Sequence, residues 1–261
     1  MDLQLNNKTA LVTGSTAGIG LAIAKRLAAE GVEVAITGRN QAKLDEAAAE
    51  VAAHGKVRTI LADAGTAEGA DTLIAALPDV DILVNNLGIY EAKPFAEIPD
   101  ADWLRFFEVN VLSGVRLSRH YFPRMLDRKT GRIIFIASES ALVTPGEMIH
   151  YGMTKTAQLA IARGLADQTR GTAVTVNSVM PGPTRSEGVV DFIRSTVGDG
   201  TASPAELEAE FFSKMRPLSL IRRLIEADEI GAMVAFLASP LAAATNGAAL
   251  RAEGGIVPTI A

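Results

Sequence analysis

Residues 13–20 read Thr13-Gly14-Ser15-Thr16-Ala17-Gly18-Ile19-Gly20. They follow a strand-length apolar run, Thr9–Thr13, and lead directly into an alanine-rich stretch of helix length, Gly18–Glu30. A glycine-rich turn between a buried strand and a helix lets the backbone approach a pyrophosphate, whose charge then faces the helix N-terminus. The spacing differs from the common G-x-G-x-x-G pattern, so a turn that only packs helix on strand stays an alternative.

The same alternation of strand-length and helix-length stretches continues along the chain. Strands are expected at Thr9–Thr13, Val32–Thr37, Val57–Leu61, Ile82–Val84, Arg132–Ala137, Ala173–Val179 and Ala248–Arg251. Helices are expected at Gly18–Glu30, Gln41–Ala53, Ala67–Leu77, Asp100–Leu126, Tyr151–Gln168 and Glu226–Ala238. The strand runs are dense in Val, Ile and Leu, which indicates burial on both faces. Repeated βα units of this kind predict an α/β fold, a doubly wound, Rossmann-like parallel sheet with helices on both faces, in a single domain over residues 1–261.

The pattern breaks after Pro181. From Thr184 to Arg222 there is no strand signal, and only short helical stretches such as Pro204–Phe212 are expected. A long irregular insertion in a compact domain is usually functional. We therefore expect residues 184–222 to form a lid over a substrate.

Composition excludes several classes of protein. The 261 residues carry 25 basic and 30 acidic side chains, and no basic stripe of the kind that binds nucleic acid is present. No apolar run is long enough to span a bilayer, and the first residues show no secretory signal. There is no cysteine, and the histidines have no metal-site spacing. The expectation is a soluble, cytoplasmic protein without a metal and without a nucleic-acid or membrane partner.

The end of the second expected strand bears on the choice of dinucleotide. The segment Ile36–Asn40 contains no carboxylate to hold the ribose hydroxyls of NAD, but it contains Arg39. A guanidinium there can pair with the 2′-phosphate of NADP, whereas a carboxylate would repel it. NADP is therefore favoured over NAD, with a solvated surface arginine as the alternative.

Three further residues suggest acid–base chemistry. Tyr151 and Lys155 lie four residues apart on an expected helix and so share a face. An adjacent ammonium stabilises a phenolate, and such a pair can exchange a proton with a carbonyl or an alcohol. Ser138 ends the strand Arg132–Ala137, at the sheet edge where ligands bind in open α/β folds. Considered one at a time, Tyr151 and Lys155 could be an ordinary surface pair, and Ser138 could simply cap a helix.

Taken together, the motifs resemble a known family. Thr13-Gly14-x-x-x-Gly18-x-Gly20, Asn85-Asn86-Leu87-Gly88, Asn110, Ser138, Tyr151-x-x-x-Lys155 and Pro181-Gly182 occur in the order typical of short-chain dehydrogenases/reductases. The resemblance covers Thr9 to about Gly255 and is to the short, single-domain branch, similar to 3-oxoacyl-carrier-protein reductases. It implies an NADP(H)-dependent oxidoreductase, with NAD possible, that interconverts a ketone or aldehyde with an alcohol.

The resemblance also implies residue roles. Tyr151 would be the general acid/base, Lys155 would lower the pKa of Tyr151, Ser138 would orient the carbonyl, and Asn110 would hold a water in a proton relay. The cofactor would contact Gly14, Ser15, Gly18, Ile19, Gly20, Arg39, Asp63, Ala64, Asn86, Gly88, Tyr151, Lys155, Pro181, Gly182 and Thr184. Family members assemble as homotetramers or homodimers, which is the expectation for this chain.

Some positions and readings stay open. Leu87 stands where the family commonly has alanine, and no basic residue precedes Gly18, so Arg39 is the main indicator of NADP. Glu139, Glu147 and His150 fall between Ser138 and Tyr151, where they could meet the substrate. The alternatives are an NAD-linked dehydrogenase of a hydroxysteroid, sugar or polyol, and a dinucleotide-binding regulator without turnover. The intact catalytic set argues against the regulator.

Overall fold

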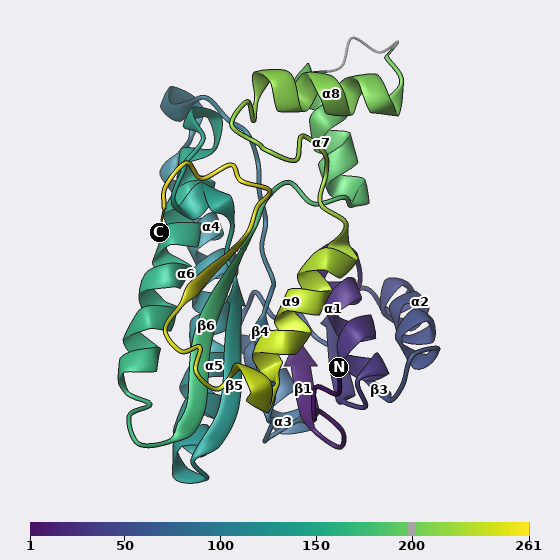
Figure 1. Ribbon diagram of the computed structural model, residues 1–261, viewed down its shortest axis with the longest axis vertical. Helices are drawn as coiled ribbons and strands as arrows, with labels where there is room; N and C mark the ends of the chain where they lie inside the picture. The colour runs from purple at the N-terminus through teal and green to yellow at the C-terminus, as the bar shows by residue number, and fades with distance from the viewer. Residues whose placement is uncertain (198–201, 261) are drawn as a thin grey trace.

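A single parallel sheet forms the centre of the computed structural model, which describes residues 1–197 and 202–260 (Figure 1). Its strands are β1 (Thr9–Val12), β2 (Glu33–Gly38), β3 (Val57–Leu61), β4 (Ile82–Asn85), β5 (Thr130–Ile136), β6 (Ala173–Pro181) and β7 (Ala249–Ala252). All neighbours pair in parallel, in the order β3-β2-β1-β4-β5-β6-β7. The chain winds outward in one direction from β1 and then in the other from β4, which confirms the doubly wound sheet.

Helices cover both faces of the sheet, as expected. They are α1 (Gly18–Ala29), α2 (Gln41–Ala52), α3 (Ala67–Ala76), α4 (Asp100–Phe107), α5 (Ser113–Asp127), α6 (Ile149–Asp167), α7 (Glu187–Val197), α8 (Pro204–Lys214) and α9 (Ala227–Ala238). Successive residues of β1 point to opposite faces: Val12 packs with α1, α2 and α9, and Leu11 packs with α3, α5 and α6. Burial on both faces explains why the strand runs are continuously apolar.

The helix expected at Asp100–Leu126 is not continuous, and that prediction was wrong. A π-helical turn, η2 (Glu108–Leu112), separates α4 from α5. The turn contains Asn110, whose side chain bonds to the backbone of Ile89 and whose carbonyl accepts from the Gln158 amide at 2.6 Å. These tertiary bonds favour the widened turn over a regular helix. Turns of this type occur frequently at functional sites.

The segment after β6 is more helical than the sequence indicates. In addition to α8, which begins at the expected Pro204, it contains α7, which the sequence analysis did not predict. The two helices share a small apolar core of their own, made by Ile193, Leu207, Phe211, Phe212 and Leu224. Figure 1 shows them stacked beyond the end of the sheet where the strands finish. Residues 198–201 of the expected lid lie outside the described residues.

Ser15 joins the ends of two central strands. Its buried hydroxyl donates to the carbonyl of Val12 at 2.7 Å and accepts from the N–H of Thr37 at 2.9 Å. The glycine turn after β1 is therefore fixed against the end of β2. These bonds keep the carboxyl ends of the two strands side by side.

We expect Ser15→Ala to lower the free energy of unfolding by about 1–3 kcal/mol, because the buried N–H of Thr37 loses its acceptor. Urea denaturation of the cofactor-free protein measures this change. Ser195→Ala is the matched control, since the exposed Ser195 hydroxyl bonds only within α7, to the Phe192 carbonyl. An equal effect of the two substitutions would contradict the role given to Ser15.

Candidate active site

The glycine turn has the shape that a bound pyrophosphate requires. Gly14 and Gly18 have positive φ angles of 60° and 54°, and a Cβ on Gly20 would lie 2.2 Å from the Gly14 carbonyl oxygen. The N-cap of α1, Ala17, offers no side-chain acceptor, and the first turn contains no acidic residue. The amide groups at the start of α1 therefore suit an anionic ligand. Ile19 packs its side chain against the core beneath the turn.

The side chain of Asn86 holds this turn in place. Its Nδ2 donates to the carbonyls of Thr13 and Gly14, both at 3.0 Å. The Thr13 hydroxyl oxygen in return accepts from the N–H groups of Asn86 and Leu87, also at 3.0 Å. Leu87, the departure noted above, packs its side chain against the core on the α3, α5 and α6 face. Ser15 and Asn86 thus shape the predicted cofactor cleft, and any cofactor contact by Ser15 falls to its backbone.

The predicted adenosine end lies at the carboxyl ends of β2 and β3. The Arg39 side chain is 84% exposed, and its Nη1 lies 3.9 Å from Asp63 Oδ2. An exposed ion pair at this distance contributes little energy, so the guanidinium is available to another anion. Asp63 Oδ1 accepts from the N–H of Gly65 at 2.9 Å, and the adjacent Ala64 is buried.

The predicted nicotinamide end lies where β6 finishes. Thr184 is buried, and its hydroxyl donates to the Gly182 carbonyl at 2.9 Å, just after Pro181. A Cβ on Gly18 would lie 3.4 Å from Cβ of Ser186, so the start of the lid segment lies beside the glycine turn. Residues far apart in the sequence are thereby gathered around one site.

The structure also brings the predicted catalytic residues together. Lys155 Nζ lies 5.6 Å from the centroid of the Tyr151 ring and donates to the Ile136 carbonyl at 2.9 Å. Ser138 lies near enough to Tyr151 to lower the pKa of its phenol. A Cβ on Gly88 would lie 3.4 Å from Lys155 Nζ and 3.6 Å from Asn110 Oδ1, so Gly88 lies against both.

Asn110 is held in its position from several sides. Its Oδ1 accepts from the N–H of Ile89 at 2.7 Å, and its Nδ2 donates to the Ile89 carbonyl at 2.9 Å and to the Thr154 hydroxyl at 3.0 Å. These bonds tie the loop after β4 to α6, close to Lys155. The side chain therefore fixes the loop that borders the catalytic lysine.

The electrostatics of the catalytic pair are dominated by burial. Burial, and then the negative charge of Glu139, raise the pKa of Tyr151 above its usual value, and Ser138 and Arg216 oppose them. Burial lowers the pKa of Lys155 to about 8, against an opposing effect of Glu139. The lowering of the Tyr151 pKa that the sequence analysis expected from Lys155 is outweighed here. At neutral pH the phenol is protonated, which is the form that can donate a proton.

The sequence analysis missed two neighbours of Tyr151. The Tyr90 ring lies 6.4 Å from the Tyr151 ring and 6.1 Å from the Phe192 ring of α7, so it connects the site with the lid segment. Arg216, just beyond α8, pairs with Glu139 at 3.4 Å. No local pattern could indicate either contact, because the partners come from separate segments.

His150 does not lie where the sequence analysis allowed it to meet the substrate. It is fully buried, with its ring 4.1 Å from that of Phe106 and 6.0 Å from that of Trp103. Burial lowers the pKa of His150. The residue packs within the aromatic cluster of α4 and does not line the cleft.

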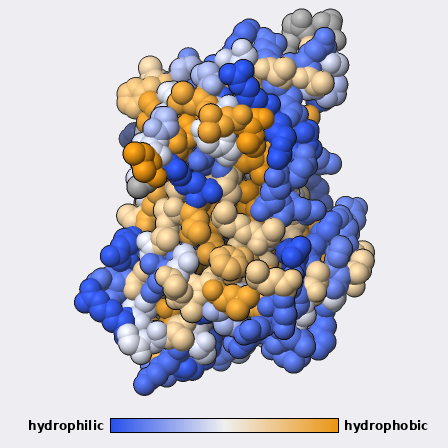
Figure 2. Space-filling model, in the orientation of Figure 1, coloured by the Kyte–Doolittle hydropathy of each residue, from blue (hydrophilic) through white to orange (hydrophobic). Residues whose placement is uncertain are grey.

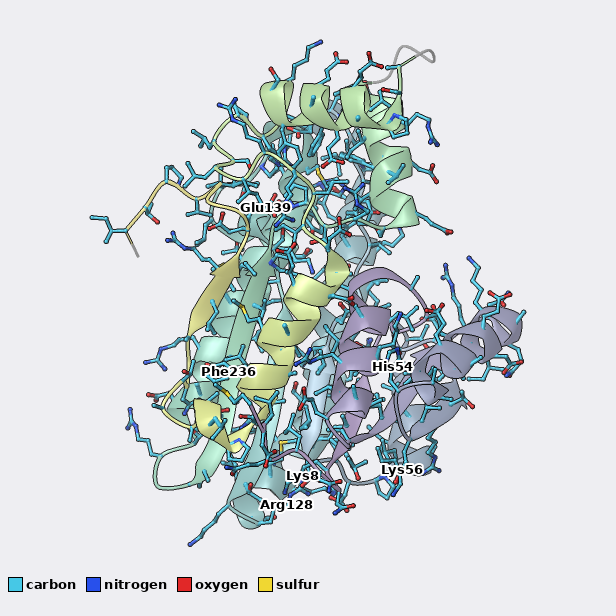
Figure 3. All side chains as sticks on the ribbon, turned by 45° about the vertical axis from the view of Figure 1, so that its right-hand side comes forward. Lys8, His54, Lys56, Arg128, Glu139 and Phe236 are labelled. Atoms are coloured by element: carbon cyan, nitrogen blue, oxygen red, sulfur yellow. The ribbon has the colours of Figure 1, made fainter. Side chains whose placement is uncertain are left out.

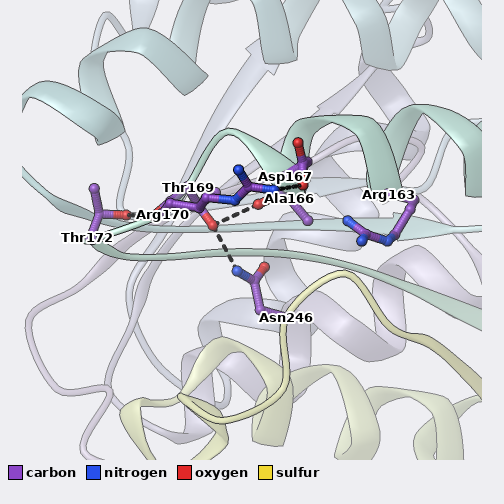
Figure 4. A pocket seen from close by; sticks show the side chains of 8 residues that line it. Arg163, Ala166, Asp167, Thr169, Arg170, Thr172 and Asn246 are labelled. Atoms are coloured by element: carbon purple, nitrogen blue, oxygen red, sulfur yellow. Dashed lines mark hydrogen bonds and ion pairs between the residues drawn. The ribbon is translucent and has the colours of Figure 1, made fainter.

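Other parts of the described chain offer no competing site. Among residues 1–197 and 202–260, no group of three or more His, Cys, Asp or Glu could hold a metal. Nor does any helix in those ranges have the length and apolar character needed to cross a membrane. A polar hollow of about 370 Å³ lies between the end of α6 and the start of β6, at the opposite sheet edge (Figure 4). Its Arg170 bonds with Asp167, and its Asn246 bonds with Thr169, so these polar groups satisfy one another.

Comparison with known proteins agrees with this geometry. The family model of short chain dehydrogenases matches residues 8–195. The "uncharacterized oxidoreductase YvaG" of Bacillus subtilis strain 168 is 51% identical, with 100% of both chains covered. The 3-oxoacyl-acyl-carrier-protein reductase FabG of Aquifex aeolicus is 30% identical over 98% of this chain and 100% of that protein. The solved structure of L-sorbose reductase from Gluconobacter frateurii, complexed with NADPH and L-sorbose, matches 100% of both chains with a TM-score of 0.92 and 28% identity.

The family match covers most of the chain. The same chain has the parallel sheet, the glycine turn, and Ser138, Tyr151 and Lys155 close together. The chain belongs to the short-chain dehydrogenase/reductase family and is an NAD(P)-dependent oxidoreductase.

Proposed function

We propose that the protein is an NADP(H)-dependent reductase of ketones or aldehydes that also catalyses the reverse oxidation of alcohols. The observation that carries the proposal is the grouping of Ser138, Tyr151 and Lys155 at the carboxyl end of β5 and the start of α6, with Gly88 against Lys155. When bound, the cofactor supplies or accepts a hydride at the substrate carbon. The protein's own residues then have to bind the substrate oxygen and move one proton.

Tyr151 is the proposed proton donor in reduction. Its raised pKa keeps the phenol protonated at neutral pH, so a proton is available when negative charge develops on the substrate oxygen. Ser138 orients that oxygen by a hydrogen bond. Lys155, with its pKa near 8, is mostly charged at neutral pH. It lies where it can hold the ribose hydroxyls and stabilise the Tyr151 phenolate left after proton donation. The water relay at Asn110 stays a prediction.

The preference for NADP is supported by Arg39. Arg39 follows Gly38, which lies beside the glycine turn, since a Cβ on Gly38 would lie 2.5 Å from Thr16. The guanidinium of Arg39 is exposed. The likeness to an NADPH-bound sorbose reductase supports the same choice. That likeness also keeps a sugar or polyol among the substrates, which is the alternative that the sequence left open.

We further propose that the segment 184–222 is the substrate lid. Its described parts lie beside Gly18 at one end and reach Glu139 through Arg216 at the other.

Assembly into a homotetramer or homodimer is supported by exposed apolar side chains, including Phe95, Leu104 and Phe107 near and on α4. Figure 2 shows further hydrophobic side chains gathered near the end of the molecule that carries α8. The cytoplasmic location stays a prediction.

Tyr151→Phe tests the proton donor. Turnover of a panel of ketones with NADPH should fall about 10²–10⁴-fold, the usual contribution of general acid catalysis, while NADPH binding is retained. Steady-state kinetics and cofactor titration measure the two effects. Tyr121→Phe is the control, because it removes the same hydroxyl from a remote buried tyrosine bonded to the Leu77 carbonyl. A wild-type rate in Tyr151→Phe would refute the assignment.

Arg39→Asp tests the cofactor preference. The ratio of kcat/KM with NADPH to kcat/KM with NADH should fall by about 100-fold or more, because a charge-assisted bond is replaced by repulsion. Arg58→Asp makes the same change of charge near the amino end of β3, away from the site, and should leave the ratio unchanged. If Arg39→Asp also leaves it unchanged, Arg39 does not bind the 2′-phosphate.

A further inference from the structure

A buried carboxylate lies directly against the catalytic serine. Glu139 follows Ser138 at the end of β5, and their exposed fractions are 4% and 6% (Figure 3). The Ser138 hydroxyl donates to Glu139 Oε2, and the N–H of Ser140 donates to Ser138 Oγ at 3.1 Å. A serine hydroxyl has one proton, and an ionised carboxylate can only accept. In this arrangement Ser138 therefore has no proton left for the carbonyl of a substrate.

The lid segment holds the other oxygen of this carboxylate. Arg216, itself 9% exposed, places Nε 3.4 Å from Glu139 Oε1 and Nη1 3.4 Å from Glu147 Oε1. The same guanidinium lies over the Phe211 ring, 5.6 Å from its centroid. A buried carboxylate stays charged only when it is paired. Arg216 is shared between Glu139 and Glu147, so this wall of the cleft carries two carboxylates and one guanidinium.

Arg185 and Arg194, two other cations of the lid segment, pair with carboxylates of their own. Arg185 pairs with Glu208 and Glu226 at 3.0 and 2.9 Å, and Arg194 pairs with Asp191 at 2.9 Å. A carboxylate on the substrate would meet Glu139 and Glu147 on this wall, where Arg216 is already paired with both. The charges on this wall favour an uncharged substrate.

Building on the proposed function, we propose that Glu139 is a specificity-determining residue, which selects an uncharged substrate with a hydroxyl group on the carbon next to the reacting carbonyl. That hydroxyl would donate to Glu139 Oε2 in place of Ser138. Ser138 is then free to turn its proton to the carbonyl oxygen. In the reverse direction the substrate is the corresponding vicinal diol.

The reaction balances once Tyr151 regains a proton from solvent. The carbonyl carbon gains a hydride from NADPH, its oxygen gains the proton of Tyr151, and the product is an alcohol with NADP⁺. The neighbouring hydroxyl of the substrate only donates a hydrogen bond and keeps its proton. A ketone without this hydroxyl cannot donate to Glu139. If Ser138 turns to the carbonyl, Glu139 loses its hydrogen-bond donor, and if Ser138 stays on Glu139, the carbonyl lacks the Ser138 hydrogen bond. Both complexes are less reactive.

A matched series of three-carbon ketones tests the proposal: hydroxyacetone, acetone and pyruvate. For the wild-type protein with NADPH, kcat/KM for hydroxyacetone should exceed that for acetone by about 10- to 100-fold, the effect of a hydrogen bond to a charged group. Pyruvate should be the poorest substrate because of charge repulsion. Glu139→Gln should bring the ratio of hydroxyacetone to acetone at least tenfold closer to unity and should raise the relative efficiency with pyruvate.

Glu147→Gln is the matched control. It removes the same charge from the same arginine, but Glu147 bonds to Arg216 and not to Ser138, so the preference for hydroxyacetone over acetone should remain. A wild-type ratio in Glu139→Gln overturns the inference. Equal wild-type efficiencies for hydroxyacetone and acetone also overturn it, even if the variant does not fold. Absence of turnover with every carbonyl overturns the proposed function and this inference with it.

The pH profile supplies a readout that a purely structural role would not change. Tyr151 faces Glu139 and Tyr90, which raise its pKa, Arg216, which lowers it, and Lys155, 5.6 Å from its ring. Neutralising Glu139 lowers the Tyr151 pKa, so the phenolate needed for alcohol oxidation forms at lower pH. The rise of kcat/KM for oxidation should therefore move to lower pH in Glu139→Gln, and an unmoved profile would count against contact between Glu139 and the catalytic pair.

Discussion

The common direction of the strands is the constraint on which the site depends. Because all neighbouring pairs are parallel, the carboxyl ends of β1, β2, β4, β5 and β6 meet at one edge, and the loops that leave them are forced together. The chain diverges between β1 and β4, which leaves a crevice there. The glycine turn occupies this crevice, and Asn86 and Ser15 fix its shape by bonds to backbone groups. The residues predicted to be catalytic reach this crevice because Ser138 follows β5 and Tyr151 lies near the start of α6.

Burial gives these catalytic groups their properties. The same desolvation raises the pKa of Tyr151 and lowers the pKa of Lys155, because burial disfavours the charged form of each side chain. Nearby charges then matter more than they would in water. Glu139 and Arg216 act on Tyr151 in opposite directions, and one of them belongs to the lid segment. The position of the proposed lid is therefore linked electrostatically to Tyr151, the proposed proton donor.

Much of the fold could be read from the sequence, because buried parallel strands and glycine turns leave local signals. Buried runs such as Ile82–Val84 indicate strands directly. The glycines of residues 13–20 stand where the turn needs positive φ angles. The π-helical turn at Asn110 could not be read, since it depends on bonds to Ile89 and Gln158. The contact of Arg216 with Glu139 spans 77 residues and leaves no periodic signal.

The two ends of the site are thus built by different physical means. The nucleotide end uses backbone amides, glycines and strand ends, which tolerate little change and are visible in the sequence. The substrate end uses charged side chains from separate segments, whose effect depends on burial and pairing. Since Arg216 offsets the charge of Glu139, a lid that carries a different residue there would leave a buried carboxylate unpaired beside Ser138. Residue 216 of the proposed lid is therefore constrained by its ion pair with Glu139, the residue that follows Ser138.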